Sequence, residues 1–169
     1  MQRLIFLGIV GISIALGGCW GTHEFRVQCI PKIAMDKKLP GKVSFKVSTQ
    51  EIYSHKLGFH EYKLHLKNGI NVCYKKLLSE VFEGGVSQKV SDVNLFITAL
   101  DTSIFPIASV IIDIRLFFKV EIFDKNMQKQ KTAMIYGFGS DPDGNKALEK
   151  AISNSFYQLL PYLEEIFVP

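Results

Sequence analysis

The sequence predicts an α+β fold, a mainly antiparallel β-sheet with two amphipathic helices packed on one face. Three observations lead to this prediction. Residues 110–123 alternate strictly between large apolar and polar side chains, as a strand with one buried face does. Residues 69–82 and 147–166 instead repeat apolar side chains every three or four positions, as amphipathic helices do. Shorter alternating segments lie around both helices, an order that favours helices gathered on one face of a sheet.

Residues 110–123 form the longest predicted strand. Its even-numbered positions are large and apolar, whereas charged residues such as Asp113 and Lys119 fall between them. A polar turn at residues 124–128 leads into a return strand over 129–139, which predicts a hairpin.

The return strand carries two sets of apolar residues on opposite faces. One set is Ala133 and Ile135, and the other is Met134, Tyr136 and Phe138. Since each set has the period of two that a buried face requires, the sequence leaves open which of them faces the core.

Shorter segments complete the predicted sheet. Alternation predicts strands at residues 42–48, 61–67 and 93–100. Residues 51–59 have no clear period and are expected to form a loop or a ragged continuation of the first of these strands. Residues 101–106 are expected to end the third of these strands.

Both predicted helices have recognisable boundaries or breaks. Asn68 is a candidate N-cap for the helix at 69–82, because its side-chain oxygen can accept an unpaired backbone N–H. In the helix at 147–166, Pro161 removes one backbone hydrogen bond and should kink the axis.

The first 18 residues predict a bacterial export signal. Gln2 and Arg3 precede an apolar run, residues 4–15, that is too short to span a bilayer comfortably. Residues 16–19, Leu-Gly-Gly-Cys, resemble the lipobox of bacterial lipoproteins, in which the cysteine is acylated and becomes the first mature residue. An ordinary secretory signal, or an uncleaved anchor in which Cys19 is incidental, is the alternative.

The lipobox resemblance also implies a location. Trp20 follows the cysteine, and in Gram-negative lipoproteins a residue other than Asp there usually permits transport to the outer membrane. The predicted organisation is a signal peptide at 1–18, a lipidated tether at 19–41 and a single periplasmic domain at 42–169. Two or three acyl chains, palmitate among them, would make Cys19 an effectively permanent membrane anchor.

Two further cysteines have two interpretations. Cys29 and Cys73 could form a disulfide in an oxidising compartment, where closing so long a loop stabilises a domain by about 3–4 kcal/mol. Alternatively, Cys29 lies in the tether and Cys73 is a free cysteine packed on an apolar helix stripe. Neither cysteine has an obvious base beside it in the sequence, so a catalytic thiol is not expected.

The charge pattern argues against nucleic-acid binding. The formal net charge is +4, and the only basic doublets are Lys37-Lys38 and Lys75-Lys76. Proteins that bind nucleic acids usually concentrate lysine and arginine on one face with aromatic residues between them.

Two short motifs are better explained as turns or helix caps than as binding sites. Gly137-x-Gly139 lacks the third glycine of a dinucleotide-binding fingerprint. Residues 141–145 have the opening spacing of a calcium loop, but Lys146 stands where glycine is required and Ile152 where glutamate is required.

The sequence also predicts no metal site and no catalytic centre. His60 and His65 differ in parity, so they should point to opposite faces of a strand and cannot share a metal ion. The motifs of serine hydrolases, zinc proteases and P-loop enzymes are missing from the sequence. We therefore expect neither a cofactor nor enzymatic activity.

The outer side of the sheet is the candidate functional surface. Ile111, Phe117 and Phe123 alternate with charges on the central strand, and Phe96 is similarly placed on its neighbour. Because two helices cover only one face, these side chains could form a docking patch for another protein or for a second copy of this chain. The alternatives are that they are ordinary scattered exposed aromatics, or that residues 21–41 cover them.

The arrangement as a whole resembles the YajG family of outer-membrane lipoproteins. A lipobox, a short spacer, strands before the first helix, long strands through 92–96 and 112–116, and an Ala/Leu-rich last helix carry this resemblance. YajG-like proteins have no established catalytic residues, so only Cys19 is carried over. Similar architecture occurs in LptE, which plugs a β-barrel in lipopolysaccharide assembly, and in auxiliary lipoproteins of ABC-type lipid transporters.

These resemblances imply a non-catalytic role in the cell envelope, exercised by binding a protein partner. A periplasmic carrier of apolar ligands is the alternative. A carrier would need a sizeable apolar pocket between the sheet and the helices.

Overall fold

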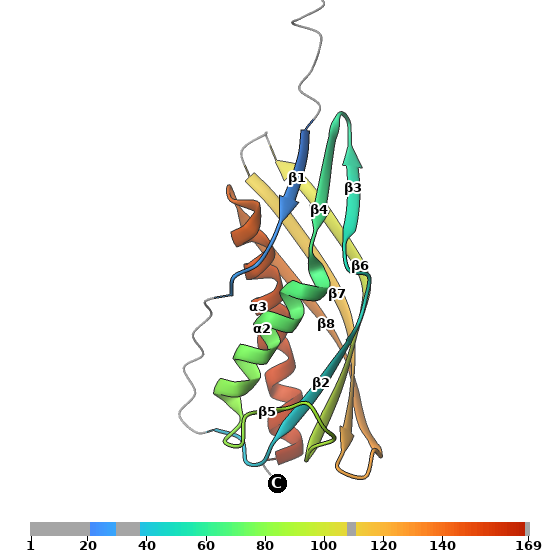
Figure 1. Cartoon of the computed structure of the whole chain (residues 1–169), viewed down its shortest axis with the longest axis vertical. Helices are drawn as coiled ribbons and strands as arrows, with labels where there is room; N and C mark the ends of the chain where they lie inside the picture. The colour runs from blue at the N-terminus through green and yellow to red at the C-terminus, as the bar shows by residue number, and fades with distance from the viewer. Residues whose placement is uncertain (1–20, 30–37, 108–110, 168–169) are drawn as a thin grey trace, which may run out of the picture.

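A computed structural model describes residues 21–29, 38–107 and 111–167 of the chain, which form two sheets and two helices (Figure 1). The main sheet has the strand order β5 (Val86–Ser87), β2 (Val43–Ser48), β6 (Val93–Ile107), β7 (Ile111–Asp124), β8 (Lys129–Asp141). The small sheet has the order β1 (Gly21–Phe25), β4 (His60–Leu64), β3 (Tyr53–Leu57), and the helices are α2 (Leu66–Val81) and α3 (Gly144–Phe167). The predicted α+β class is confirmed.

Both helices lie on the same side of the main sheet, with the small sheet beside them (Figure 1). The main sheet is mainly antiparallel, as predicted, but both sheets are mixed rather than purely antiparallel. β6, β7 and β8 form an antiparallel meander, but β2 pairs in parallel with both β5 and β6, and β1 pairs in parallel with β4. The chain between β2 and β6 crosses over through α2, which is how two neighbouring strands come to run in the same direction.

Two segments predicted to be irregular are strands. The segment expected to be a loop contains β3, which forms an antiparallel hairpin with β4. β6 continues through residues 101–106, because a bulge between Ala99 and Asp101 restores its register with β7. Pro106 lies near the end of this strand and still pairs with Ile112.

The inner face of the main sheet, which the helices cover, holds much of the core. The core side chains that β6, β7 and β8 direct there are at most 3% exposed: Val93, Leu95, Ile97, Ile104, Ile114, Leu116, Phe118, Val120, Ile122, Ala133 and Ile135. Burying a large apolar side chain is worth about 1.5–3 kcal/mol before conformational entropy is subtracted.

Two glycines of β8 explain which of its faces is buried. A Cβ atom on Gly137 would lie 2.0 Å from the carbonyl oxygen of Ala151, and one on Gly139 would lie 1.9 Å from that of Ala147. α3 therefore packs directly on the backbone of β8 on the side that carries Ala133. The other apolar set, with Tyr136 and Phe138, lies on the outer face.

The helices differ slightly from the prediction. α2 begins at Leu66, and the residue at its N-cap position is His65, which makes no side-chain capping hydrogen bond. The prediction of Asn68 as the N-cap is therefore wrong, because the fully buried Leu66 and Ile70 extend the packed helix toward its N-terminus. α3 continues through Pro161 to Phe167.

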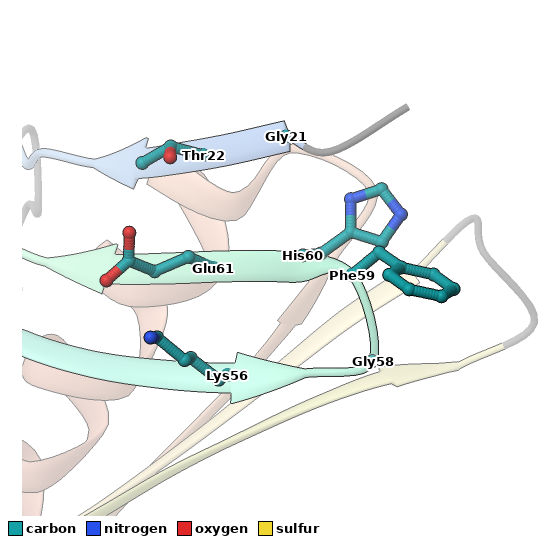
Figure 2. Close-up of a pocket in the computed structure, with 7 residues that line it drawn as sticks. All are labelled: Gly21, Thr22, Lys56, Gly58, Phe59, His60 and Glu61. Atoms are coloured by element: carbon teal, nitrogen blue, oxygen red, sulfur yellow. The ribbon is translucent and has the colours of Figure 1, made fainter. Parts of the chain in front are cut away.

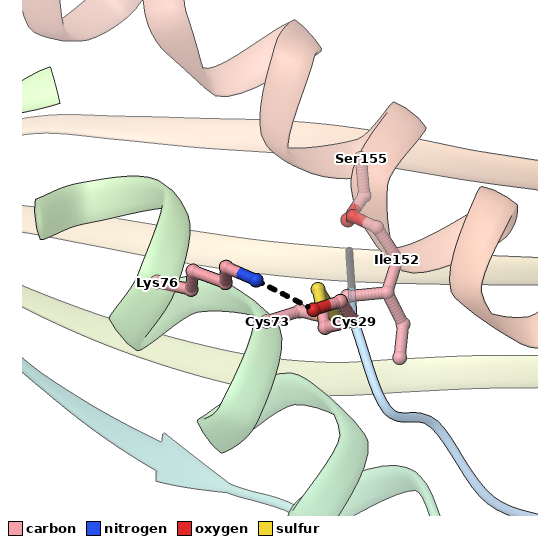
Figure 3. Close-up of a disulfide and its surroundings, with 5 residues drawn as sticks. All are labelled: Cys29, Cys73, Lys76, Ile152 and Ser155. Carbon is pink, nitrogen blue, oxygen red and sulfur yellow. Dashed lines mark hydrogen bonds between the residues drawn. A yellow bond between two sulfur atoms is a disulfide. The ribbon is translucent and has the colours of Figure 1, made fainter. Parts of the chain in front are cut away.

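Part of the segment predicted to be a tether belongs to the fold. β1 pairs with β4, and Val27, Cys29 and Leu39 are buried. Cys29 forms a disulfide with Cys73 of α2, and its carbonyl oxygen accepts a hydrogen bond from Nζ of Lys76 at 3.1 Å (Figure 3). The disulfide therefore fastens the chain that follows β1 to the helical layer. Cys19 and the predicted signal peptide at residues 1–18 lie outside the described residues.

Candidate docking face

The outer face of the main sheet carries large apolar side chains that no described helix or strand covers. Seven of them, which we call the outer apolar face, are each 36–49% exposed: Phe105, Ile107, Ile111, Phe117, Met134, Tyr136 and Phe138. They come from β6, β7 and β8, where they alternate with the core side chains of the inner face.

Strand register brings these residues together. Phe117 of β7 pairs with Tyr136 of β8, and Ile107 of β6 pairs with Ile111 of β7. Directly opposite residues on neighbouring strands have Cβ atoms about 4.5–5.5 Å apart, so each pair presents a continuous apolar surface. Because the three strands are held by backbone hydrogen bonds along their length, the surface is preorganised.

A buried carboxylate lies within this face. Asp113 is 7% exposed, and its register partners are Phe105 on β6 and Ser140 on β8. Its Oδ1 atom is buried and has no hydrogen-bond partner among the described residues. The neighbouring Arg115 lies over the Phe105 ring, with its guanidinium carbon 5.1 Å from the ring centroid. An unpaired buried carboxylate oxygen lowers stability.

The end of the outer face beside the turn between β7 and β8 carries more charged side chains, and its aromatic side chains are partly buried. Phe96 and Phe123 form an edge-to-face pair with centroids 5.1 Å apart, and Nζ of Lys129 lies 5.9 Å from the Phe123 centroid. Glu121 accepts hydrogen bonds from Lys129 and, more weakly, from Lys119, and together these lysines hold the pKa of Glu121 below its usual value. At this end, ion pairs accompany the two aromatic side chains. The outer apolar face lies toward the other end of the sheet.

The free edge of the sheet is closed by side chains of α3. The backbone N–H of Tyr136 donates to Oε1 of Gln158 at 2.9 Å, and the carbonyl oxygen of Phe138 accepts from Nδ2 of Asn154 at 2.6 Å. Lys150 donates to the carbonyl oxygen of Ser140 at 3.2 Å. These side chains block the addition of another strand to β8, so a partner would bind the face of the sheet rather than its edge.

The four residues predicted from the sequence all lie on the outer face, but they do not form one patch. Ile111 and Phe117 belong to the outer apolar face, whereas Phe96 and Phe123 pair at the polar end. Sequence reasoning missed Phe105, because a strand break was expected there. It missed the apolar set of β8 because that strand had two candidate core faces.

The described residues provide little support for a metal site or an apolar carrier pocket. His23 and His60 have ring nitrogens 3.2 Å apart, but nowhere in the described ranges do three or more His, Cys, Asp or Glu side chains gather as a metal site would require. A surface cavity of about 320 Å³ beside these histidines includes Lys56 and Glu61 in its lining (Figure 2). A second, of about 450 Å³, is lined by polar and charged residues between β1 and the start of α3.

Of the helices in the described ranges, neither combines the length and the apolar composition that a transmembrane span needs.

Together these features define an α+β domain with one covered and one uncovered sheet face. No family model matches the chain, and no curated protein matches it in sequence. Among solved structures, protein XCC0632 from Xanthomonas campestris, described by the family model DUF330, superposes with a TM-score of 0.57 over 88% of this chain and 95% of that one. The two sequences are 7% identical, so this likeness shows a shared fold alone.

A minor lipoprotein from Acinetobacter baumannii is a second structural match, at 15% identity. The match covers 75% of this chain and 80% of that one. Its TM-score of 0.29 is too low to establish a common arrangement of strands and helices.

Proposed function

We propose that this protein is a bacterial lipoprotein, anchored through acylated Cys19 to the outer membrane with its domain in the periplasm. There it acts without catalysis, by binding another envelope protein through the outer apolar face. The lipobox at residues 16–19 supports the anchor. A role of the kind that YajG-like and LptE-like lipoproteins have, or that auxiliary lipoproteins of ABC-type transporters have, is consistent with both features.

The outer apolar face is the observation that carries the binding function. Contiguous exposed apolar surface on a folded domain marks an interaction site more often than scattered exposed residues do. The types present, Phe, Tyr and Met with Arg115 among them, are those enriched in the cores of protein interfaces.

Because the proposed anchor at Cys19 holds the domain at a membrane, a small interface is sufficient for binding a partner in that membrane. Confining the domain to a membrane surface raises its effective concentration near a membrane-bound partner, which increases apparent affinity without any new contact. The alternative of an apolar-ligand carrier is less well supported, because polar and charged residues contribute to the lining of both described cavities.

The anchor is tested by labelling cells that produce the full chain with radioactive palmitate. We expect label in the wild-type protein and none in Cys19→Ser, and we expect the variant to leave the membrane fraction. Equal labelling of the two proteins would refute acylation at Cys19.

The docking face is tested by placing a photocrosslinking benzoylphenylalanine at position 117 in the envelope of living cells. Tyr157 on α3 is the matched control site, because it is aromatic and 40% exposed, against 36% for Phe117. We expect a discrete protein adduct from position 117 and none from position 157. The proposal fails if position 117 gives no adduct, or if both positions give the same ones.

A further inference from the structure

The fold places the proposed anchor at one end of the molecule. β1 begins at Gly21, two residues after Cys19. The start of β1, the turn between β3 and β4, the end of β6 and the start of β7 all lie at this end of the long axis (Figure 1). An extended chain spans at most about 3.6 Å per residue, so an acylated Cys19 would hold this end within about 10 Å of the lipid headgroups.

Four exposed apolar side chains lie at this end, which we call the tip: Leu57, Phe59, Ile107 and Ile111. Phe59 is 63% exposed, which is the highest value among the exposed large hydrophobic residues described. It projects from the turn next to His60, and His60 pairs with Gly21 at the start of β1 (Figure 2). Leu57 and Ile107 are 38% and 47% exposed, so both hairpins present apolar side chains at this end.

We propose that the tip is a membrane-contacting surface, and that Phe59 and its neighbours insert into the interface of the bilayer that holds Cys19. This inference rests on the proposed acylation of Cys19. A lipid surface fits as the occupant because the chain leading to the anchor starts beside Phe59. Apolar side chains at the headgroup boundary are stabilised by burial to a depth of about 5–10 Å.

The charges at the tip indicate which lipids it accepts. Lys56 and Glu61 both line the cavity beside Phe59, and Nζ of Lys63 lies 3.6 Å from Oε2 of Glu61, so these three side chains leave only a single net positive charge there. Insertion should therefore depend on apolar burial and on the anchor, rather than on attraction to anionic lipids. We expect it in vesicles of pure phosphatidylcholine, and we expect little change when anionic lipid or salt is added.

The test compares the two ends of the molecule. The acylated full-length protein carries an environment-sensitive NBD label on Phe59→Cys or, as the control, on Met127→Cys. Met127 is 41% exposed and lies in the turn between β7 and β8, at the opposite end of the long axis (Figure 1). Because Cys29 and Cys73 are paired and Cys19 is acylated, only the introduced cysteine reacts.

On phosphatidylcholine vesicles containing headgroup-proximal doxyl lipid, we expect a blue-shifted emission at position 59 and quenching about twofold greater than at position 127. A label at Leu57→Cys should behave like that at position 59, and all labelled proteins should unfold at the wild-type temperature. Equal quenching at the two ends, with palmitate present on Cys19, would overturn the membrane contact alone. Absence of palmitate from Cys19 would overturn both this inference and the proposed anchor.

Discussion

The two faces of the main sheet are built from the same three strands, yet they have opposite surroundings. On β7, Phe118 is fully buried beneath the helices, whereas Phe117, its neighbour in sequence, is 36% exposed. The inner face follows the rules of a core, with aliphatic side chains and glycines that admit α3. The outer face combines exposed apolar side chains with charged ones and encloses the carboxylate of Asp113. Packing explains the first face, and a binding partner is the simplest explanation of the second.

The largest expected effect comes from truncating an aromatic residue on each face. Phe118→Ala should lower the free energy of unfolding by about 3–5 kcal/mol, because it leaves a cavity in the core. Phe117→Ala should lower it by less than about 1 kcal/mol, because its side chain is partly in water already. Urea unfolding of both variants measures the difference.

If Phe117→Ala were as destabilising as Phe118→Ala, the outer face would be a second core that another part of the molecule covers. The docking interpretation would then lose its basis.

The second-largest expected effect comes from removing the disulfide on the side of the main sheet that the helices cover. Replacing Cys29 and Cys73 together by Ala should lower the free energy of unfolding by about 3–4 kcal/mol, because the bond closes a loop with a sequence separation of 44 residues. Adduct formation at position 117 should persist in conditions where the variant stays folded. Loss of the adduct in a folded variant would show that binding at the outer face depends on the disulfide on the helical side of the sheet.

Asp113 should show a smaller effect of the opposite sign. Replacing it with Val removes a buried oxygen that has no partner and introduces a residue that favours strands, so the free energy of unfolding should rise by about 1–3 kcal/mol. The same variant should reduce photocrosslinking from position 117. A destabilised Asp113→Val protein would indicate that the carboxylate serves the fold instead.

The smallest effect is a pH dependence on the covered side. Nε2 of His55 lies 3.0 Å from Oγ1 of Thr102, and partial burial lowers the pKa of His55 below its usual 6.5, opposed in part by the Asp101 carboxylate. The unfolded state therefore binds a proton first as pH falls, so stability is complete above pH 6.5 and declines below it. His55→Gln should flatten the urea midpoint between about pH 7.5 and 5, and an unchanged slope would exclude this residue as the cause.

Periodicity predicted those parts of the fold that depend on one strand or helix. Residues 110–123 were placed correctly as a strand in the described part, and the two helices were found within a few residues of their observed bounds. The alternation on that strand also located Ile111 and Phe117 on the outer face.

The features of the fold that periodicity did not predict depend on contacts between segments that are distant in the sequence. No local pattern reveals that β2 runs parallel to β6, or that a bulge after Ala99 carries the strand on to Phe105. The buried face of β8 is decided by Gly137 and Gly139, whose role becomes visible only when α3 is packed against them. The candidate site could be predicted only in part for the same reason, because it is shared among three strands.

If a partner binds the outer apolar face, this face is covered in the envelope and the helical surface is not. Hydroxyl-radical footprinting measures this directly, by comparing the protein in intact envelopes with the same protein extracted and purified in detergent. We expect Phe117, Tyr136 and Phe138 to be protected in the envelope and to react freely after purification, while Tyr157 reacts equally in both. Equal reactivity of the outer apolar face in the two preparations would contradict the proposal that a partner binds this face.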